Sequence, residues 1–559
     1  MRFLILPLPG ALLLGALVLP CMVPDAGAVL SKTEMARAVR GAAETGDTAA
    51  VDSLISLYPT YSPDVVALLH RFAFDDTAGA PGPYRAAAAL TAERARAGGD
   101  SLPARVHATI TAFDEHALAS WRDAERLYLA GVRALQGLAY DDADTALDSA
   151  ITLYRAIGER YRLGLAVSYR GLSALNRGLF DEAEAFLIEA SGIQQQTGDA
   201  YNRAATLAYR AQILEFLGRY GDALAQYEES LALFRSRRAH QDIAETLHSI
   251  ANVMTTRGDF RGADDQLALS EALYDTLGNA VGLALTQIAR GDLARRFGEF
   301  EAAEKRYESA EREIRENDLE PLAGTLWIAR GILLQMLGDH RTAARYYEEA
   351  ISSERAIGDT LSVLLATLNR ARALLEAGER NRAAEIAEGV LGDVDARPYP
   401  SIQRLASETL GDYSVRTNDL KRAVISFERA LENARASGES EAEADNRMAL
   451  ALVHQKMGAT DASIEGLEQA LALFKEMGHL PAVLETKLEL ADALRLAGDY
   501  DRARSEARET LETARFYDDW ITQSKALFSI ASIDYEAGRL EESGARLRGL
   551  DSLEYASQL

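Results

Sequence analysis

Apolar residues recur along most of this chain at the spacing of amphipathic helices, and the predicted helices come in pairs. In residues 204–217 one helical stripe consists of Leu207, Ala211, Leu214 and Leu217. In residues 221–234 a second stripe consists of Ala223, Tyr227, Leu231 and Phe234. Gly218 lies between them, where a helix can end in a left-handed residue that Gly or Asn adopts at least cost. This pattern predicts a helical hairpin.

The hairpin repeats in strict register every 40 residues. The turn position holds Gly178, Gly218, Gly258, Gly298, Gly338, Gly378, Asn418, Gly458, Gly498 and Gly538. Two places further on, most units have a bulky residue, such as Phe180 or Tyr220, and three places after that they have Ala or Ser. We therefore predict about eleven units, which run from residue 123 to the C-terminus.

Small residues in both helices have a packing reason, because two helices cross closely only where side chains are short. The second helix has Ala or Ser at the position of Ala223, and the first helix has Gly or Ala at the position of Ala211, seven places before the turn. One such hairpin cannot bury its apolar stripes alone, so its stability must come from neighbouring units.

The pattern G-x-[FY]-x-x-A, seen in "GDALAQYEESL" and "GDYDRARSEARETL", resembles the tetratricopeptide repeat in a longer, 40-residue variant. The Gly or Ala seven places before the turn matches a small position of that family. The resemblance covers roughly residues 123–559 and implies an all-α fold, an α-solenoid of stacked antiparallel helical hairpins.

The N-terminus has the features of an export signal. Residues 1–28 contain one early cation, Arg2, an apolar run over residues 11–19, and a small-residue ending at Ala28, which predict a signal peptide cleaved there. The apolar run is too short to cross a bilayer comfortably. We expect a periplasmic or extracellular protein with no membrane insertion after cleavage. A lipoprotein signal at Cys21 stays open, although the proline before it departs from the usual pattern.

Residues 29–122 are less regular. They predict helices over 33–47, 49–58 and 62–74, and a Gly/Pro-rich linker over 77–84. A further pair at about 83–97 and 102–118 is separated by two glycines, and we interpret it as a degenerate capping repeat of the kind that solenoids need at their ends.

Composition limits the classes of partner and site. Cys21 is the only cysteine, so a chain cleaved after Ala28 has no disulfide, thiolate nucleophile or cysteine-based zinc site. The net charge of −25 argues against sequence-independent nucleic-acid binding, which requires basic side chains on the phosphates. Two interpretations of this charge remain: a solvated acidic surface, or an acidic groove for a basic partner.

No catalytic motif stands out. The eight histidines are scattered, with no HExxH, and the chain lacks a P-loop, a G-x-S-x-G motif and a strand before any glycine cluster. We predict a protein without enzymatic activity and without a metal or other cofactor.

One column departs from the expected packing. The residue before the small position of the first helix is Arg170, Arg210, Arg290, Arg330 and Arg370 in five units, where the family pattern normally has Leu. One interpretation is an internal ladder in which each arginine pairs with a Glu of an adjacent second helix, such as Glu189, Glu229, Glu308 or Glu348. The other is a recognition surface that borders the concave groove and binds a carboxylate or an acidic segment.

In peptide-binding members of the family, Lys and Asn at inner positions of the first helix clamp a C-terminal carboxylate. Here those positions hold Tyr169, Tyr209, His248, Asn252, Asp292, Asn369, Arg372, Asp412 and Asp492. The clamp is absent, which counts against that ligand. With the five arginines, the candidate partner-binding residues are Tyr169, Tyr209, Asn252, Asn369 and Arg372.

The N-terminal signal and the resemblance together lead us to expect an exported scaffold that binds a peptide segment or folded partner on its concave surface. An alternative is the sensing or regulatory arm of bacterial proteins that resemble repeat-containing caspase-like peptidases or transcription regulators, which here would act with a separate effector. Leu547 and Leu550 in the last unit also suggest head-to-tail self-association.

Overall fold

The computed structural model describes residues 32–57, 60–75, 82–137, 139–177, 179–357, 360–394, 400–437, 439–517 and 519–545. These residues form helices without strands. The predicted signal peptide, the turn residue Gly178, most of the linker and the last-unit leucines Leu547 and Leu550 lie outside the described residues.

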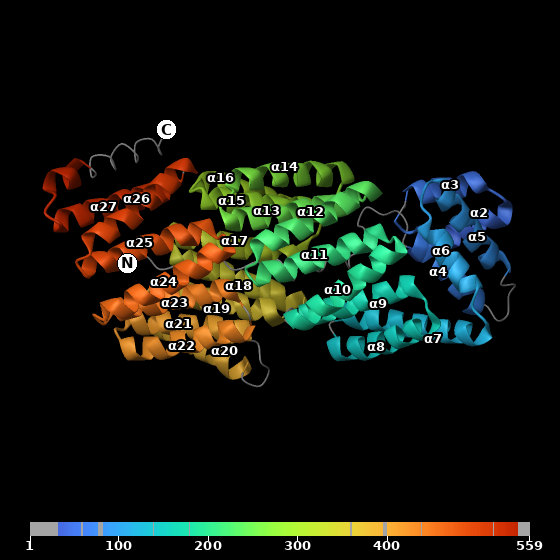
Figure 1. Ribbon diagram of the computed structural model, residues 1–559, viewed down its shortest axis with the longest axis horizontal. Helices are drawn as coiled ribbons and strands as arrows, with labels where there is room; N and C mark the ends of the chain where they lie inside the picture. Colours follow the sequence, from blue (N-terminus) through green and yellow to red (C-terminus); the bar gives the residue numbers. More distant parts are fainter. Residues whose placement is uncertain are drawn as a thin grey trace.

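Antiparallel helix pairs follow one another along the chain, as the register predicts (Figure 1). The ten complete pairs are α7 Glu115–Gln136 and α8 Tyr140–Ile157, α9 Arg160–Asn176 and α10 Phe180–Thr197, α11 Ala200–Phe216 and α12 Tyr220–Arg237, α13 His240–Arg257 and α14 Phe260–Leu277, α15 Ala280–Arg296 and α16 Phe300–Glu316, α17 Ala323–Met336 and α18 His340–Ile357, α19 Thr360–Glu376 and α20 Arg380–Val394, α21 Pro400–Arg416 and α22 Leu420–Ser437, α23 Ser440–Lys456 and α24 Thr460–Met477, and α25 Leu480–Leu496 and α26 Tyr500–Phe516. A short 3-10 helix, η1 Glu320–Leu322, precedes α17, and α27 Trp520–Glu536 begins an eleventh pair. The protein is thus an all-α solenoid.

The turn within each hairpin has the predicted left-handed backbone. Among the described residues of that column, φ is +71° at Gly218 and +90° at Gly378, and the substituted Asn418 has φ +62°. The turn between hairpins shows the same feature, for example φ +73° at Gly158 and φ +54° at the non-glycine residue Arg238. This second column of turn residues was not predicted from the sequence.

The small columns are the points of closest helix packing. Ala223 and its equivalents in the other second helices are fully buried or nearly so. In the first helices, a Cβ at Gly331 would lie 2.7 Å from the Tyr347 ring, and one at Gly411 would lie 2.7 Å from the Phe427 ring. Glycine at these positions therefore makes room for an aromatic side chain of the second helix.

The N-terminal region consists of α2 Lys32–Thr45, α3 Thr48–Leu57, α4 Ser62–Asp75, α5 Gly82–Ala97 and α6 Leu102–Thr111. The first helix of the expected capping pair, 83–97, matches α5 to within one residue. The second, expected over 102–118, ends at Thr111 in α6, and residues 115–118 belong to α7. The side chain of Asp114 accepts a hydrogen bond from the Ala117 amide at 2.8 Å and so caps a new helix there.

A buried ionic network joins this region to the first pairs. The Arg162 guanidinium lies 2.5 Å from the Asp64 carboxylate and 2.7 Å from that of Glu125. The Tyr161 hydroxyl also donates to Asp64, at 3.0 Å. Three helices, α4, α7 and α9, are thereby held together at one end of the solenoid.

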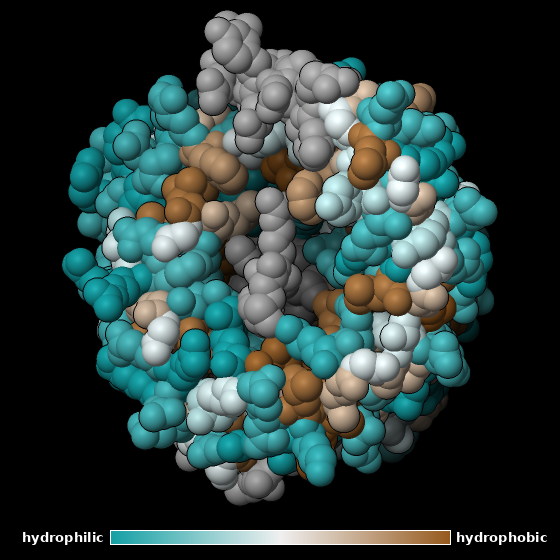
Figure 2. All heavy atoms as spheres, turned by 90° about the vertical axis from the view of Figure 1, so that its left-hand side faces the viewer, coloured by the Kyte–Doolittle hydropathy of each residue, from teal (hydrophilic) through white to brown (hydrophobic). Residues whose placement is uncertain are grey.

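The solenoid coils so tightly that successive superhelical turns contact each other. The Tyr220 hydroxyl donates to Glu441, 221 residues further along, and the Trp520 indole donates to the Phe297 carbonyl at 3.2 Å across 223 residues. Since each unit has 40 residues, one turn takes about five and a half units. Viewed from the end that carries α27, the described residues form a ring around a central opening (Figure 2).

Candidate functional site

The first helix of each pair lies on the inner side of the superhelix. Several successive first helices contact one another, including α13 with α15, α19 with α21, and α25 with α27. In the described chain no two successive second helices make contacts of that extent. Elements that lie closer together are on the concave side of a curved stack, so the first helices surround the central opening.

Each first helix has one side that faces neither its own second helix nor the preceding repeat. In α25, Ala491 and Leu494 are buried against neighbouring helices, whereas Glu485, Glu489 and Asp492 are half-buried. With 3.6 residues per turn, these three acidic positions fall within an arc of about 60°. We call this side, in all first helices, the inner face.

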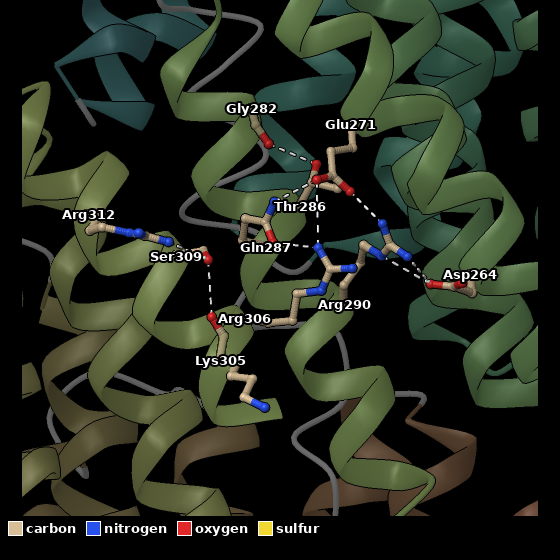
Figure 3. A network of polar contacts seen from close by, with 10 residues as sticks. All are labelled: Asp264, Glu271, Gly282, Thr286, Gln287, Arg290, Lys305, Arg306, Ser309 and Arg312. Atoms are coloured by element: carbon tan, nitrogen blue, oxygen red, sulfur yellow. Dashed lines mark hydrogen bonds and ion pairs between the residues drawn. The ribbon is translucent and has the colours of Figure 1, made fainter. Parts of the chain in front are cut away.

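The arginine column does not lie on the inner face; its side chains point toward acids of second helices. Arg290 is the best-connected example: its guanidinium lies 2.9 Å from Asp264 and 2.5 Å from Glu271, both on the preceding second helix α14 (Figure 3). In the same network Gln287 donates to Glu271 at 2.7 Å, and Arg306 donates to Gln287 at 3.0 Å.

The other four arginines of the column also have acidic or amide partners. These are Glu182, Asp144 and Asp148 for Arg170, Gln226 and Glu184 for Arg210, Glu304 and Glu311 for Arg330, and Glu348 for Arg370. Arg330 and Arg170 are largely buried, at 6% and 9% exposure. The column is an internal ladder of ion pairs between consecutive repeats.

The acids named from the sequence are only partly the ones used. Glu348 does pair with Arg370, but Glu189 pairs with Arg155 and Glu229 pairs with Arg203. The difference arises because the arginines pair with acids about one helical turn away from the expected glutamates. Most of these acids lie 26 or 19 residues before their arginine in the chain.

The remaining candidate residues do lie on the inner face. Tyr169, Tyr209 and Asn369 occupy the position equivalent to Glu489, and Asn252 and Arg372 occupy the position equivalent to Asp492; all five are half-buried. The structure therefore separates the candidate set into internal arginines and five residues on the inner face.

Within the described part of the chain, four carboxylates on the inner face of α21, α23 and α25 have neither a hydrogen bond nor an ion pair. They are Asp412, Asp445, Glu485 and Glu489. From the sequence, Asp412 was expected only as part of a mixed inner surface. The recurrence of an acid at 445 and 485, one repeat apart in the same column, is the signal that could have revealed the group.

Burial and mutual repulsion perturb these carboxyl groups. Burial raises the pKa of Asp412 to about 6, and burial together with Glu485 and Asp492 raises the pKa of Glu489 to about 7. Burial, with Glu441 and Glu408 nearby, raises the pKa of Asp445 well above its usual value.

Groups suited to metal binding do not come together in the described chain, where no three His, Cys, Asp or Glu side chains form a cluster that could hold an ion. Two histidines far apart in the sequence do meet: His70 Nε2 lies 2.9 Å from His107 Nδ1 between α4 and α6. Burial and the neighbouring His107 lower the pKa of His70 to about 4.

None of the helices in the described part of the chain combines the length and hydropathy needed to cross a bilayer.

Comparison with known proteins agrees with the repeat pattern. Residues 170–236, which span α10, α11 and most of α12, match the model of the tetratricopeptide repeat. No curated protein sequence matches the chain significantly.

Solved structures with some similarity to the chain include BtubC (BKLC) from P. vanneervenii, at 14% identity over 39% of this chain and 92% of that one, with a TM-score of 0.36. The apo form of the quorum sensor NprR from B. thuringiensis is similar at 13% identity over 61% of this chain and 99% of that one, with a TM-score of 0.40.

The helix pairs and the matched segment together define a helical repeat protein, in which residues 170–236 match the tetratricopeptide repeat. This fold is consistent with a scaffold for protein–protein interaction.

Proposed function

We propose that this protein is an exported, non-enzymatic scaffold that binds a peptide segment, or an extended segment of a folded partner, on its inner face. The observation that supports this most is that two sets of positions in the first helices have different contacts. The arginine column is occupied by ion pairs between repeats, while half-buried polar and aromatic side chains, Tyr209 and Asn369 among them, remain on the inner face.

Export is part of the proposal and rests on the N-terminal sequence alone. A chain that begins at Val29 contains no cysteine, because Cys21 is the only one in the sequence. A single introduced cysteine can therefore carry a bulky maleimide label at a chosen position without side reactions.

The test uses this property to block one face at a time. Asn252→Cys places the label on the inner face, and Gly389→Cys places it on the exposed outer side of α20, where a Cβ meets no atom within 4 Å. We expect a partner captured from the exported fraction of the source cells to be lost only when residue 252 is labelled. Equal capture by both labelled proteins, with unchanged helicity, would contradict the inner-face assignment.

A further inference from the structure

The inner face changes character along the superhelix, and its C-terminal part carries uncompensated negative charge. Several acids there are already neutralised: Asp492 lies 2.6 Å from Arg495, and Glu376 pairs with Arg416. Asp412, Asp445, Glu485 and Glu489 have no such partner.

Asp445 is the most informative of the four. Its side chain is 8% exposed and makes no hydrogen bond or ion pair. The charged groups around it come from three helices: Arg404 and Glu408 on α21, Glu441 on α23, and Glu485 on α25.

Arg404, the cation named above, is already engaged in other ion pairs. Arg404 lies 2.8 Å from Glu408 and 2.9 Å from Glu439, and one oxygen of the buried Glu408 still lacks a hydrogen-bond partner. A buried carboxylate without a counter-ion is unfavourable, so this arrangement is one that an added cation would stabilise.

Charged groups of both signs also surround the other two acids whose pKa is raised. Glu489 faces Glu485 and Asp492 on its own helix and Lys525 on α27, which is not within ion-pair distance. Asp412 faces Glu408 and Arg416 on α21 and Arg372 and Glu376 on α19.

We propose that the inner face of α21, α23 and α25 binds a lysine- or arginine-rich peptide segment, with Asp412, Asp445, Glu485 and Glu489 as its anionic contacts. This inference deepens the proposed function by naming the chemical class of the ligand. It is in line with the acidic-groove interpretation of the net charge of −25.

The acidic positions recur from one first helix to the next, so a suitable probe carries cations spread along its length. An extended chain rises about 3.3 Å per residue, and a cation at every third residue therefore recurs about every 10 Å. A Lys-Gly-Gly repeat peptide is the simplest such probe.

Binding of such a peptide must be linked to proton release. A cation favours the ionised carboxylates, so binding is weak where they are protonated and tightens as the pH rises through their pKa values. For Glu489, with a pKa of about 7, the ionised fraction rises about tenfold between pH 6 and pH 8. We expect the affinity for the probe to rise by at least that factor.

The experiment is calorimetric titration of the chain from Val29 with the Lys-Gly-Gly peptide, and with a Glu-Gly-Gly peptide as the charge-reversed control. The test variant is Glu485→Gln with Glu489→Gln. The matched control is Glu432→Gln with Glu476→Gln, which makes the same change in net charge on exposed positions of α22 and α24. Two buffers of different ionisation enthalpy measure the protons released.

We expect the inner pair of substitutions to weaken binding at least tenfold and to abolish most of the proton release, while the outer pair changes affinity less than twofold. Equal losses in the two variants, or no binding of the lysine peptide at low salt, would overturn the proposal. If the peptide fails but the label at residue 252 still blocks partner capture, only the ligand class is wrong; if both fail, the inner face is not the binding site.

Discussion

Substitution of Gly331 by Ala tests whether the small column of the first helices is set by the aromatic side chains of the second helices. The new Cβ would lie 2.7 Å from Cε1 and 2.8 Å from Cζ of Tyr347, whereas carbon atoms in ordinary contact lie about 3.5–4.0 Å apart. The ring cannot move freely, because it is fully buried and its hydroxyl donates to Gln335 at 2.5 Å.

Overpacking of this kind costs about 1–3 kcal/mol, while alanine in place of glycine within a helix contributes about 1 kcal/mol of stability. Gly389→Ala isolates the second effect, because position 389 is exposed on a helix and has open space around it. We expect Gly331→Ala to be less stable than Gly389→Ala by about 1–3 kcal/mol.

The assay is native-state hydrogen exchange of amides in α17 and α18, which reports local free energies in a chain whose repeats need not unfold together. Adding Tyr347→Leu to Gly331→Ala should restore much of the loss, since the equivalent pair Ala251 and Leu267 is accommodated elsewhere in the solenoid. Equal stability of Gly331→Ala and Gly389→Ala would refute the packing argument.

Three further predictions concern charge, pH and the contact between superhelical turns. Arg162→Leu leaves the fully buried Glu125 carboxylate without its cation and should cost about 3–5 kcal/mol by chemical denaturation, whereas Arg330→Leu leaves half-exposed acids and should cost about 1 kcal/mol or less. Burial lowers the pKa of His248 to about 4, so the imidazole is neutral in the folded chain. In the unfolded chain it takes up a proton below its ordinary pKa of about 6.5, and this uptake destabilises the fold progressively as the pH falls below that value. His248→Leu removes this group. The free energy of unfolding of the variant, measured by thermal unfolding, should therefore rise relative to that of the native chain by up to about 3 kcal/mol between pH 7 and pH 4. A difference that does not change with pH would contradict this prediction. Gly298→Ala and Gly498→Ala both introduce a side chain at positive φ. Only the Cβ at position 298 meets the next superhelical turn, 3.0 Å from the ring of a tryptophan, so Gly298→Ala should have the lower melting temperature. Equal melting temperatures would argue against that contact.

The register of the hairpins could be predicted from the sequence because its determinants are local. Gly218 ends one helix by its backbone conformation, and Ala223 allows the next helix to approach, whatever lies further along the chain. Leu217, expected in the buried stripe, is half-buried, and the fully buried Ile213 faces the neighbouring repeat instead. That side of the helix depends on how repeats stack.

The roles of the charged residues were less predictable for the same reason. The sequence showed that Arg290 replaces a core residue, but its partners Asp264 and Glu271 are fixed by the rotation between consecutive hairpins. The proximity of Tyr220 to Glu441 depends on the sum of many such rotations, which no single repeat reveals. Asp445 and Glu485 stand one repeat apart in the sequence, yet only the position of the inner face shows that both lack a counter-ion.

The contacts between superhelical turns also affect how the molecule responds to stretching. An open tetratricopeptide coil can lengthen like a spring, because each repeat touches only its neighbours. Here the bonds from Tyr220 to Glu441 and from Trp520 to Phe297 join one coil to the next. Tension on the ends of the stack would have to break these lateral contacts before the coils could separate and the stack could lengthen.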